Sequence, residues 1–197
     1  MYTDVDLPVI TLHPAAKDFL FKHYRSLKRI FGDVLGLLEV DYLSITLITP
    51  QNELLFLSSQ PSIECNLIEH GLWQYDPCLD DAFLCGTSHQ YWNNVYLQPV
   101  HKKLLHYKQE IFEFGFGLAI PHLFREFRVI YTFGFKATDA ITRQKIENNI
   151  AKLCDMGQYC LQNILNTIEL PNKQKTNPPR PVLKLVINNE VPYEKNT

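Results

Sequence analysis

The residue types that most often carry chemistry are scattered along this sequence. Cys85 lies four residues before His89, and Cys65 lies five before His70, so a cysteine hydrolase with a histidine base is formally possible. No local nucleophile signature surrounds either cysteine. The adjacent carboxylates of Asp80–Asp81 point in different directions on a predicted helix, which makes them poor partners for acid–base work. We therefore expect a protein that is not an enzyme.

Metal-binding and phosphate-binding patterns are equally weak. The seven histidines lack the close pairing of helical or loop metal sites, and the five cysteines contain no CxxC pair. Residues Phe114–Gly117 have the sequence FGFG, which lacks the third glycine and the following helix of a phosphate-binding loop. We expect no metal and no cofactor, and we expect the cysteines to be buried reduced thiols.

The charge balance argues against nucleic acid as a direct partner. A formal net charge of -2 and a pI near 6.4 provide no broad attraction for phosphate backbones. The N-terminal stretch MYTDVDLPVITLHPAA carries acidic residues where a signal peptide carries basic ones. No window approaches the roughly 20 apolar residues of a membrane helix. The sequence therefore predicts a cytoplasmic protein without a membrane span.

Length and composition fit one domain with tails. A chain of 197 residues with 46% hydrophobic residues can bury a sizeable core. We expect this domain to cover residues 1–169 and an extended linker and tail to cover 170–197, because Asn172–Pro181 has the sequence NKQKTNPPRP. Val182–Asn188 could form one strand, either added to the sheet edge or docked on a partner.

Helical spacing and stop signals predict five helices. The first is amphipathic; its basic outer face could contact an acidic partner, but a solvated polar face is the preferred explanation. The predicted helices run from Pro14 to Gly32, from Pro61 to Gly71, from Cys78 to Cys85, from Leu97 to Phe114, and from a cap at Thr138 or Asp139 to Ile168. The basic face of the first comprises Lys17, Lys22, Arg25, Lys28 and Arg29.

Alternating apolar residues and turn signals predict two β-hairpins. The first joins Glu39–Thr49 to Glu53–Ser59, and the second joins Phe116–Leu123 to Phe127–Phe135. The aromatic stretch His89–Val95 is predicted as a short strand or an extended segment. Most aromatic residues are expected in the core, but a sheet covered by helices can also enclose an apolar cavity in which Trp or Tyr orients a small ligand.

The order of these elements, with Asp76–Pro77, Trp92 and Gly117–Pro121 at their places in it, resembles the autoinducer-binding domain of LuxR-type quorum-sensing regulators. The match covers roughly Ala15 to Ile168. This resemblance implies an α/β fold, an α-β-α sandwich with a central antiparallel sheet of about five strands and helices on both faces.

The resemblance also implies a ligand site. In that family the residue equivalent to Asp76 accepts a hydrogen bond from the acyl-homoserine lactone amide, and the one equivalent to Trp92 packs against the lactone ring. Gly117 matches a glycine that lets the backbone approach the pocket. Thr132 falls where the family often has a small hydroxyl residue on the last strand.

Two features depart from the family pattern. The family's lactone-binding Trp falls at about Ile63 and its pocket Tyr at about Leu67, so two hydrogen-bond donors are absent; Trp73 or Tyr75 could replace them from a shifted register. Only 27 residues follow Leu170, fewer than the about 60 residues of a helix-turn-helix domain, so we expect no DNA-binding domain.

The leading interpretation is a bacterial sensory or regulatory binding domain that takes a small apolar ligand with a polar head. It would pair with itself or a related subunit through the long last helix. The alternative is a ligand-free adaptor whose chamber is filled by its own side chains and which binds proteins in a multi-subunit bacterial assembly such as a secretion system. A large cavity beside Asp76 and Trp92 favours sensing, and a filled one favours the adaptor.

Overall fold

The computed structural model describes residues 9–171, so the predicted linker and the predicted strand Val182–Asn188 lie outside it. One open sheet has six strands in the order β1-β3-β2-β6-β5-β4. Neighbouring strands are antiparallel, except that β1 and β3 are parallel. The strands are β1 (Thr11–Leu12), β2 (Tyr42–Ile48), β3 (Glu53–Ser58), β4 (Gln90–Tyr91), β5 (Phe116–Phe124) and β6 (Phe127–Phe135).

Both predicted hairpins are confirmed, and the sheet is slightly larger than expected. β2 pairs with β3, and β5 pairs with β6 along the whole of both strands. Asn52 and Arg125 adopt positive φ values of 58° and 53° in the two connecting turns, which lets the chain reverse tightly. β1 and β4 are two-residue edge strands, too short to show a periodic pattern.

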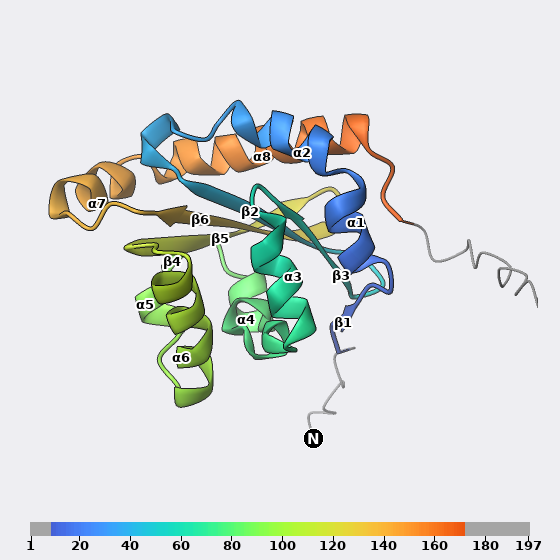
Figure 1. Ribbon diagram of the computed structural model, residues 1–197, viewed down its shortest axis with the longest axis horizontal. Coiled ribbons are helices and arrows are strands. Elements are labelled where there is room, and N and C mark those ends of the chain that lie inside the picture. Colours follow the sequence, from blue (N-terminus) through green and yellow to red (C-terminus); the bar gives the residue numbers. More distant parts are fainter. Residues whose placement is uncertain (1–8, 172–197) are drawn as a thin grey trace, which may run out of the picture.

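Helices cover both faces of the sheet, as Figure 1 shows, so the predicted α-β-α sandwich is confirmed. One face carries two helices, and the opposite face carries four. The first set is α2 (Tyr24–Gly32) and α8 (Ile150–Thr167). The second set is α3 (Pro61–Glu69), α4 (Asp81–Leu84), α5 (Trp92–Val95) and α6 (Pro99–His106).

The first and last predicted helices are each broken in two. The first divides at His23 into α1 (Ala16–Lys22), which packs against β3 and α3, and α2, which packs mainly against α8. The last divides at Asn148–Asn149 into α7 (Ala140–Glu147) and α8. The cap at Asp139 is confirmed, since its carboxylate accepts a hydrogen bond of 2.8 Å from the Thr142 N–H.

The middle of the chain departs most from the prediction. The strand predicted over His89–Val95 ends at Tyr91, and Trp92 begins helix α5. The helix predicted from Leu97 to Phe114 is α6 followed by a π-helical turn, η4 (Tyr107–Ile111). The helix predicted over Cys78–Cys85 is η3 (Pro77–Leu79) followed by α4, and η2 (Leu72–Tyr75) precedes it; η1 (Leu37–Glu39) precedes β2.

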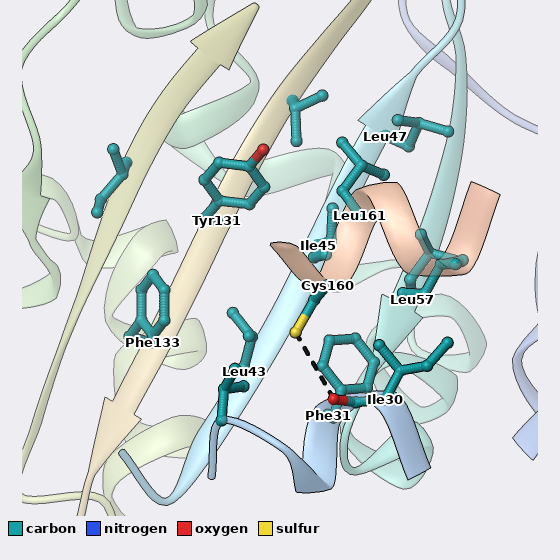
Figure 2. Close-up of a cluster of buried hydrophobic side chains, with 14 of the residues drawn as sticks. Ile30, Phe31, Leu43, Ile45, Leu47, Leu57, Tyr131, Phe133, Cys160 and Leu161 are labelled. Atoms are coloured by element: carbon teal, nitrogen blue, oxygen red, sulfur yellow. Dashed lines mark hydrogen bonds between the residues drawn. The ribbon is translucent and has the colours of Figure 1, made fainter. Parts of the chain in front are cut away.

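The largest core lies between the sheet and the α2–α8 layer. Alternate residues of β2 and β6 point into it, among them Leu43, Ile45 and Tyr131, toward Cys160 and Leu161 of α8 (Figure 2). All seven residues of β2 are buried, because the residues that do not point into this core face the layer of α3 to α6. That second face holds the candidate site.

Candidate functional site

Asp76 lies between the short helices η2 and η3, in the layer of α3 to α6. Its backbone is extended, with φ of -82° and ψ of 109°, because Pro77 disfavours the helical region for the residue before it. This geometry makes Asp76 the N-cap of η3, and its Oδ1 accepts a hydrogen bond of 3.0 Å from the Cys78 N–H. The turn therefore holds the carboxylate in a defined orientation.

Two further polar side chains reach Asp76 from inside the domain. The Tyr96 hydroxyl donates to the two carboxylate oxygens of Asp76 at 3.3 and 3.2 Å. The Lys108 Nζ donates to the Tyr96 Oη at 2.7 Å and lies 3.9 Å from the Asp76 Oδ2. Lys108 is 4% exposed and Tyr96 is 2% exposed. Asp76, Tyr96 and Lys108 therefore form one polar network on the inner side of the Asp76 turn.

Burial keeps the Tyr96 hydroxyl and the Cys78 thiol of this site protonated. It raises the pKa of the Tyr96 hydroxyl well above its usual value, and the nearby negative charge of Asp76 raises it further. Burial, with Asp76 again as the next cause, also raises the pKa of the Cys78 thiol. Tyr96 therefore stays a phenol that donates to the carboxylate, and Cys78 stays a thiol.

The Trp92 ring lies beside this polar network. Its side chain is 1% exposed and lies against Gly117, where a Cβ would come within 2.4 Å of the indole. The Lys108 Nζ lies 4.8 Å from the centroid of the Trp92 ring, within the range of a cation–π interaction. The indole Nε1 is buried and has no hydrogen-bond partner among residues 9–171. Gly117 therefore provides space for the Trp92 ring.

The enclosed cavity beside Asp76 has a volume of about 20 Å³. This is room for about one water molecule. Two of the candidate residues from the sequence, Thr132 and Trp73, line it together with Asp76, whereas Tyr75 is half exposed and does not. The remaining lining residues are Thr46, Phe56, Leu67, Cys78, Leu79 and Ile130.

Side chains of this chain fill the rest of the layer. Ile63 and Leu67, where the resemblance implies hydrogen-bond donors, are buried in a cluster with Trp92 and Tyr96. Tyr42, Leu104, Tyr107 and Phe114 complete that cluster. The Tyr42 hydroxyl also donates to the buried carboxyl of Glu64. The layer thus has the packing of a core rather than of an open chamber.

An open cleft lies on the outer side of Asp76. Its volume is about 660 Å³, and it is bounded by the segment from Val9 to Leu12 on one side and by residues of η2, η3 and α4 on the other. Trp73, Asp76 and Leu79 line both this cleft and the enclosed cavity. These three residues therefore separate the interior from the surface.

The cysteine–histidine pairs suggested by the sequence do not form hydrogen bonds in the structure. His89 contacts Glu147 at 3.3 Å, and His70 contacts the Asn66 carbonyl at 2.9 Å. A different pair, His122 and Cys154, has its Nδ1 and Sγ 3.9 Å apart. Burial lowers the pKa of His122 and raises the pKa of Cys154, so the thiolate that a nucleophile requires is disfavoured.

Within residues 9–171 no three His, Cys, Asp or Glu side chains are placed to share a metal ion. Over the same range no helix has the length and apolar character needed to cross a bilayer.

Lys108 is the site residue that sequence reasoning missed. The predicted apolar face of this segment contains Val100, Leu104 and Ile111, and Lys108 lies four residues after Leu104 on the same face. A lysine within an apolar stripe is a detectable signal, because a charged group on the buried face of a helix requires a partner. The partner, Tyr96 with Asp76 beyond it, comes from a part of the chain that the spacing does not connect to it.

No protein-family model and no curated protein sequence matches the chain. Solved structures do match. Escherichia coli SdiA has a TM-score of 0.55 at 10% identity, over 82% of this chain and 73% of that one. CepR2 from Burkholderia cenocepacia, an N-acylhomoserine lactone dependent LuxR family transcription factor, has a TM-score of 0.55 at 14% identity, over 78% of this chain and 99% of that one.

A third structure is SdiA in complex with octanoyl-rac-glycerol. Its TM-score is 0.53 at 12% identity, over 76% of this chain and 65% of that one. These likenesses concern the fold. They confirm that the chain has the architecture of LuxR-type autoinducer-binding domains, as the order of its elements predicted.

Proposed function

We propose that this protein is a non-enzymatic regulatory binding domain that acts through contacts with other proteins. Its inner chamber, the space between the sheet and the layer of α3 to α6, is filled by its own side chains. The observation that carries this proposal is the cavity of about 20 Å³ beside Asp76. Sites for small organic ligands usually measure about 300–1,000 Å³. An acyl-homoserine lactone would have to displace packed core residues to enter.

The polar groups support the same conclusion. The Asp76 carboxylate already accepts hydrogen bonds from Cys78 and Tyr96, with Lys108 beside it. A ligand amide that took over this carboxylate would have to displace those donors. A ligand carbonyl would find apolar Ile63 and Leu67 where the family has donors, and a buried carbonyl without a donor costs about 1–3 kcal/mol.

The first experiment measures the melting temperature, Tm, with short-chain and long-chain acyl-homoserine lactones. We expect no saturable rise, because a ligand that does not bind the folded state cannot stabilise it. CepR2, described as dependent on N-acylhomoserine lactone, is the positive control. A saturable rise with any of these compounds would contradict the filled chamber.

The second experiment tests the protein contact. The outer face of α2 carries exposed Arg25, Lys28 and Arg29 on the layer opposite the chamber. Charge reversal of these residues to Glu should abolish co-purification of a partner identified by mass spectrometry, while circular dichroism stays unchanged. The matched control reverses Lys102 and Lys103 on α6 and should retain that partner. Equal recovery with both sets would count against this surface.

The open cleft supports a second candidate function, the sensing of a small amphiphile. Its volume of about 660 Å³ is within the range of ligand sites, and it combines apolar Ile10, Leu12 and Leu79 with the carboxylates of Asp76 and Asp80. The chain has two tryptophans, so Trp92→Phe leaves Trp73 as the single fluorescent reporter in this cleft. Octanoyl-glycerol should change its emission saturably, and the absence of any change would exclude this candidate for that ligand class.

A further inference from the structure

Lys108 occupies the polar end of the filled chamber. Removal of an ammonium group from water is costly unless hydrogen bonds and opposite charge replace the water. Here the Lys108 Nζ has the Tyr96 oxygen at 2.7 Å and the Asp76 carboxylate at 3.9 Å. It also lies 4.8 Å from the ring centroid of Trp92 and 5.0 Å from that of Tyr96. Oxygen acceptors and aromatic rings thus surround one cation.

We propose that this end of the chamber is a binding site for a primary ammonium group and that the chain's own Lys108 is its resident ligand. The inference rests on the proposed function, because it identifies what fills the chamber. Asp76 supplies the negative charge, and Tyr96 supplies an acceptor. Trp92 and Tyr96 present ring faces, which attract cations electrostatically. The ligand class is a primary alkylammonium ion.

Lys108 belongs to a different element from the residues that surround its ammonium group. α6 ends at His106, and the π-helical turn η4 carries Lys108 inward next to Tyr107, which is itself 9% exposed. Leu104, four residues earlier, is fully buried on the same side of the segment. π-helical turns are rare and are frequent at functional sites. The backbone of η4 therefore keeps the Lys108 ammonium in a site that η2, η3 and α5 form.

The test is chemical rescue of a truncated side chain. Lys108→Ala removes the atoms beyond Cβ, and n-propylammonium has the same heavy atoms as the part removed. The variant should melt several degrees below the wild type, and n-propylammonium chloride should raise its Tm saturably by about 2–4 °C or more. The same salt should leave the wild type unchanged, because Lys108 already occupies the site.

Two controls separate an ammonium site from an empty hole. Propan-1-ol has the same length without the charge and should rescue less. Asp76→Asn in the Lys108→Ala background keeps an acceptor for the Cys78 N–H but removes the charge, and it should abolish the rescue. Equal rescue by the alcohol, rescue of the wild type, or no saturable rescue of Lys108→Ala would overturn the proposal.

Lys108→Met keeps most of the stem and provides a second measurement if Lys108→Ala does not fold. In a double-mutant cycle with Asp76→Asn, the losses of Tm should be less than additive, because each variant removes the same interaction. Additive losses would overturn the proposal. The acyl-lactone titration of the wild type is an independent readout, so a failure of the filled-chamber function and a failure of the ammonium site give different results.

Discussion

Glu64 is a fully buried carboxyl group on α3 and is 1% exposed. It accepts a hydrogen bond from the Tyr42 hydroxyl in the layer that fills the chamber. Burial raises the pKa of Glu64 above its usual value, although hydrogen bonds from Ser58, Tyr42 and Ser44 favour the ionised form. The unfolded chain therefore releases this proton at a lower pH than the folded chain does.

This difference predicts a pH-dependent effect of Glu64→Gln. The contribution of Glu64 to stability is greatest below its unfolded pKa of about 4.3 and falls as the pH rises through the higher folded pKa. At neutral pH the variant should melt a few degrees above the wild type, and the gap should narrow toward acidic pH. Thermal melts across that range check this, with Glu126→Gln on an exposed turn as the control. A gap that does not change with pH would refute the assignment.

Gly117 is the residue on which the position of Trp92 depends. A Cβ at Gly117 would lie 2.4 Å from the indole, which is buried and cannot move outward without opening α5. Gly117→Ala should destabilise the fold by about 1–3 kcal/mol through overpacking. Gly32→Ala is the matched control, because nothing lies within 4 Å of its added Cβ. Urea unfolding of both variants measures the difference, and equal stabilities would contradict the close contact.

At the scale of elements, the sequence predicted the hairpins better than the helices. Alternation in β2 and turn residues at Asn52 act locally, so they are visible in a short window. The break at His23 has no proline or glycine signal. On its two sides, α1 packs against β3 and α3 whereas α2 packs mainly against α8, and these contacts are a property of the tertiary structure.

The candidate site was predictable to a similar extent. Family resemblance pointed to Asp76, Trp92 and Gly117. In the structure the Asp76 carboxylate and the Trp92 ring lie beside the Lys108 ammonium, and Gly117 on β5 lies against the Trp92 ring. Tyr96 stood out only as one aromatic among many. Lys108 comes from an element whose π-helical turn has no distinctive residue pattern. The polar network therefore depends on contacts between segments that spacing alone does not relate.

Helix α8 depends on a close contact with the sheet at Gly157. Glycine inside a helix costs about 1 kcal/mol relative to alanine, so propensity alone would make Gly157→Ala stabilising. A Cβ there, however, would lie 2.5 Å from the Tyr131 ring on β6. We expect the variant to lose about 1–3 kcal/mol instead. Chemical denaturation checks the sign, with Gln158→Ala on the same helix as the control.

The partner of this contact supplies a second measurement. Tyr131→Leu reduces the ring that Gly157→Ala would strike, so the double variant should lose less than the sum of the single variants. Additive losses would show that the strain arises elsewhere in α8.

The two faces of the whole molecule differ in how they are packed. One continuous cluster joins the sheet to α2 and α8. On the other face two smaller clusters meet, one around Phe56, Cys78 and Ile130 and the other around Leu67 and Trp92. The enclosed cavity lies at this boundary, because residues from both clusters line it. The enclosed cavity thus lies between two small hydrophobic cores.

This arrangement predicts where the domain opens first. Isolated helices shorter than about 12 residues are marginal in water, and the segment from η2 to α5 consists of elements of two to four residues. Hydrogen exchange should therefore show lower protection over residues 72–96 than over β2, β6 and α8. Lys108→Met should increase exchange in residues 72–96 and leave α8 unchanged, because the lysine connects η4 to Tyr96 and Asp76. Uniform exchange across both layers would instead indicate one cooperative unit, in which the chamber opens only when the whole domain unfolds.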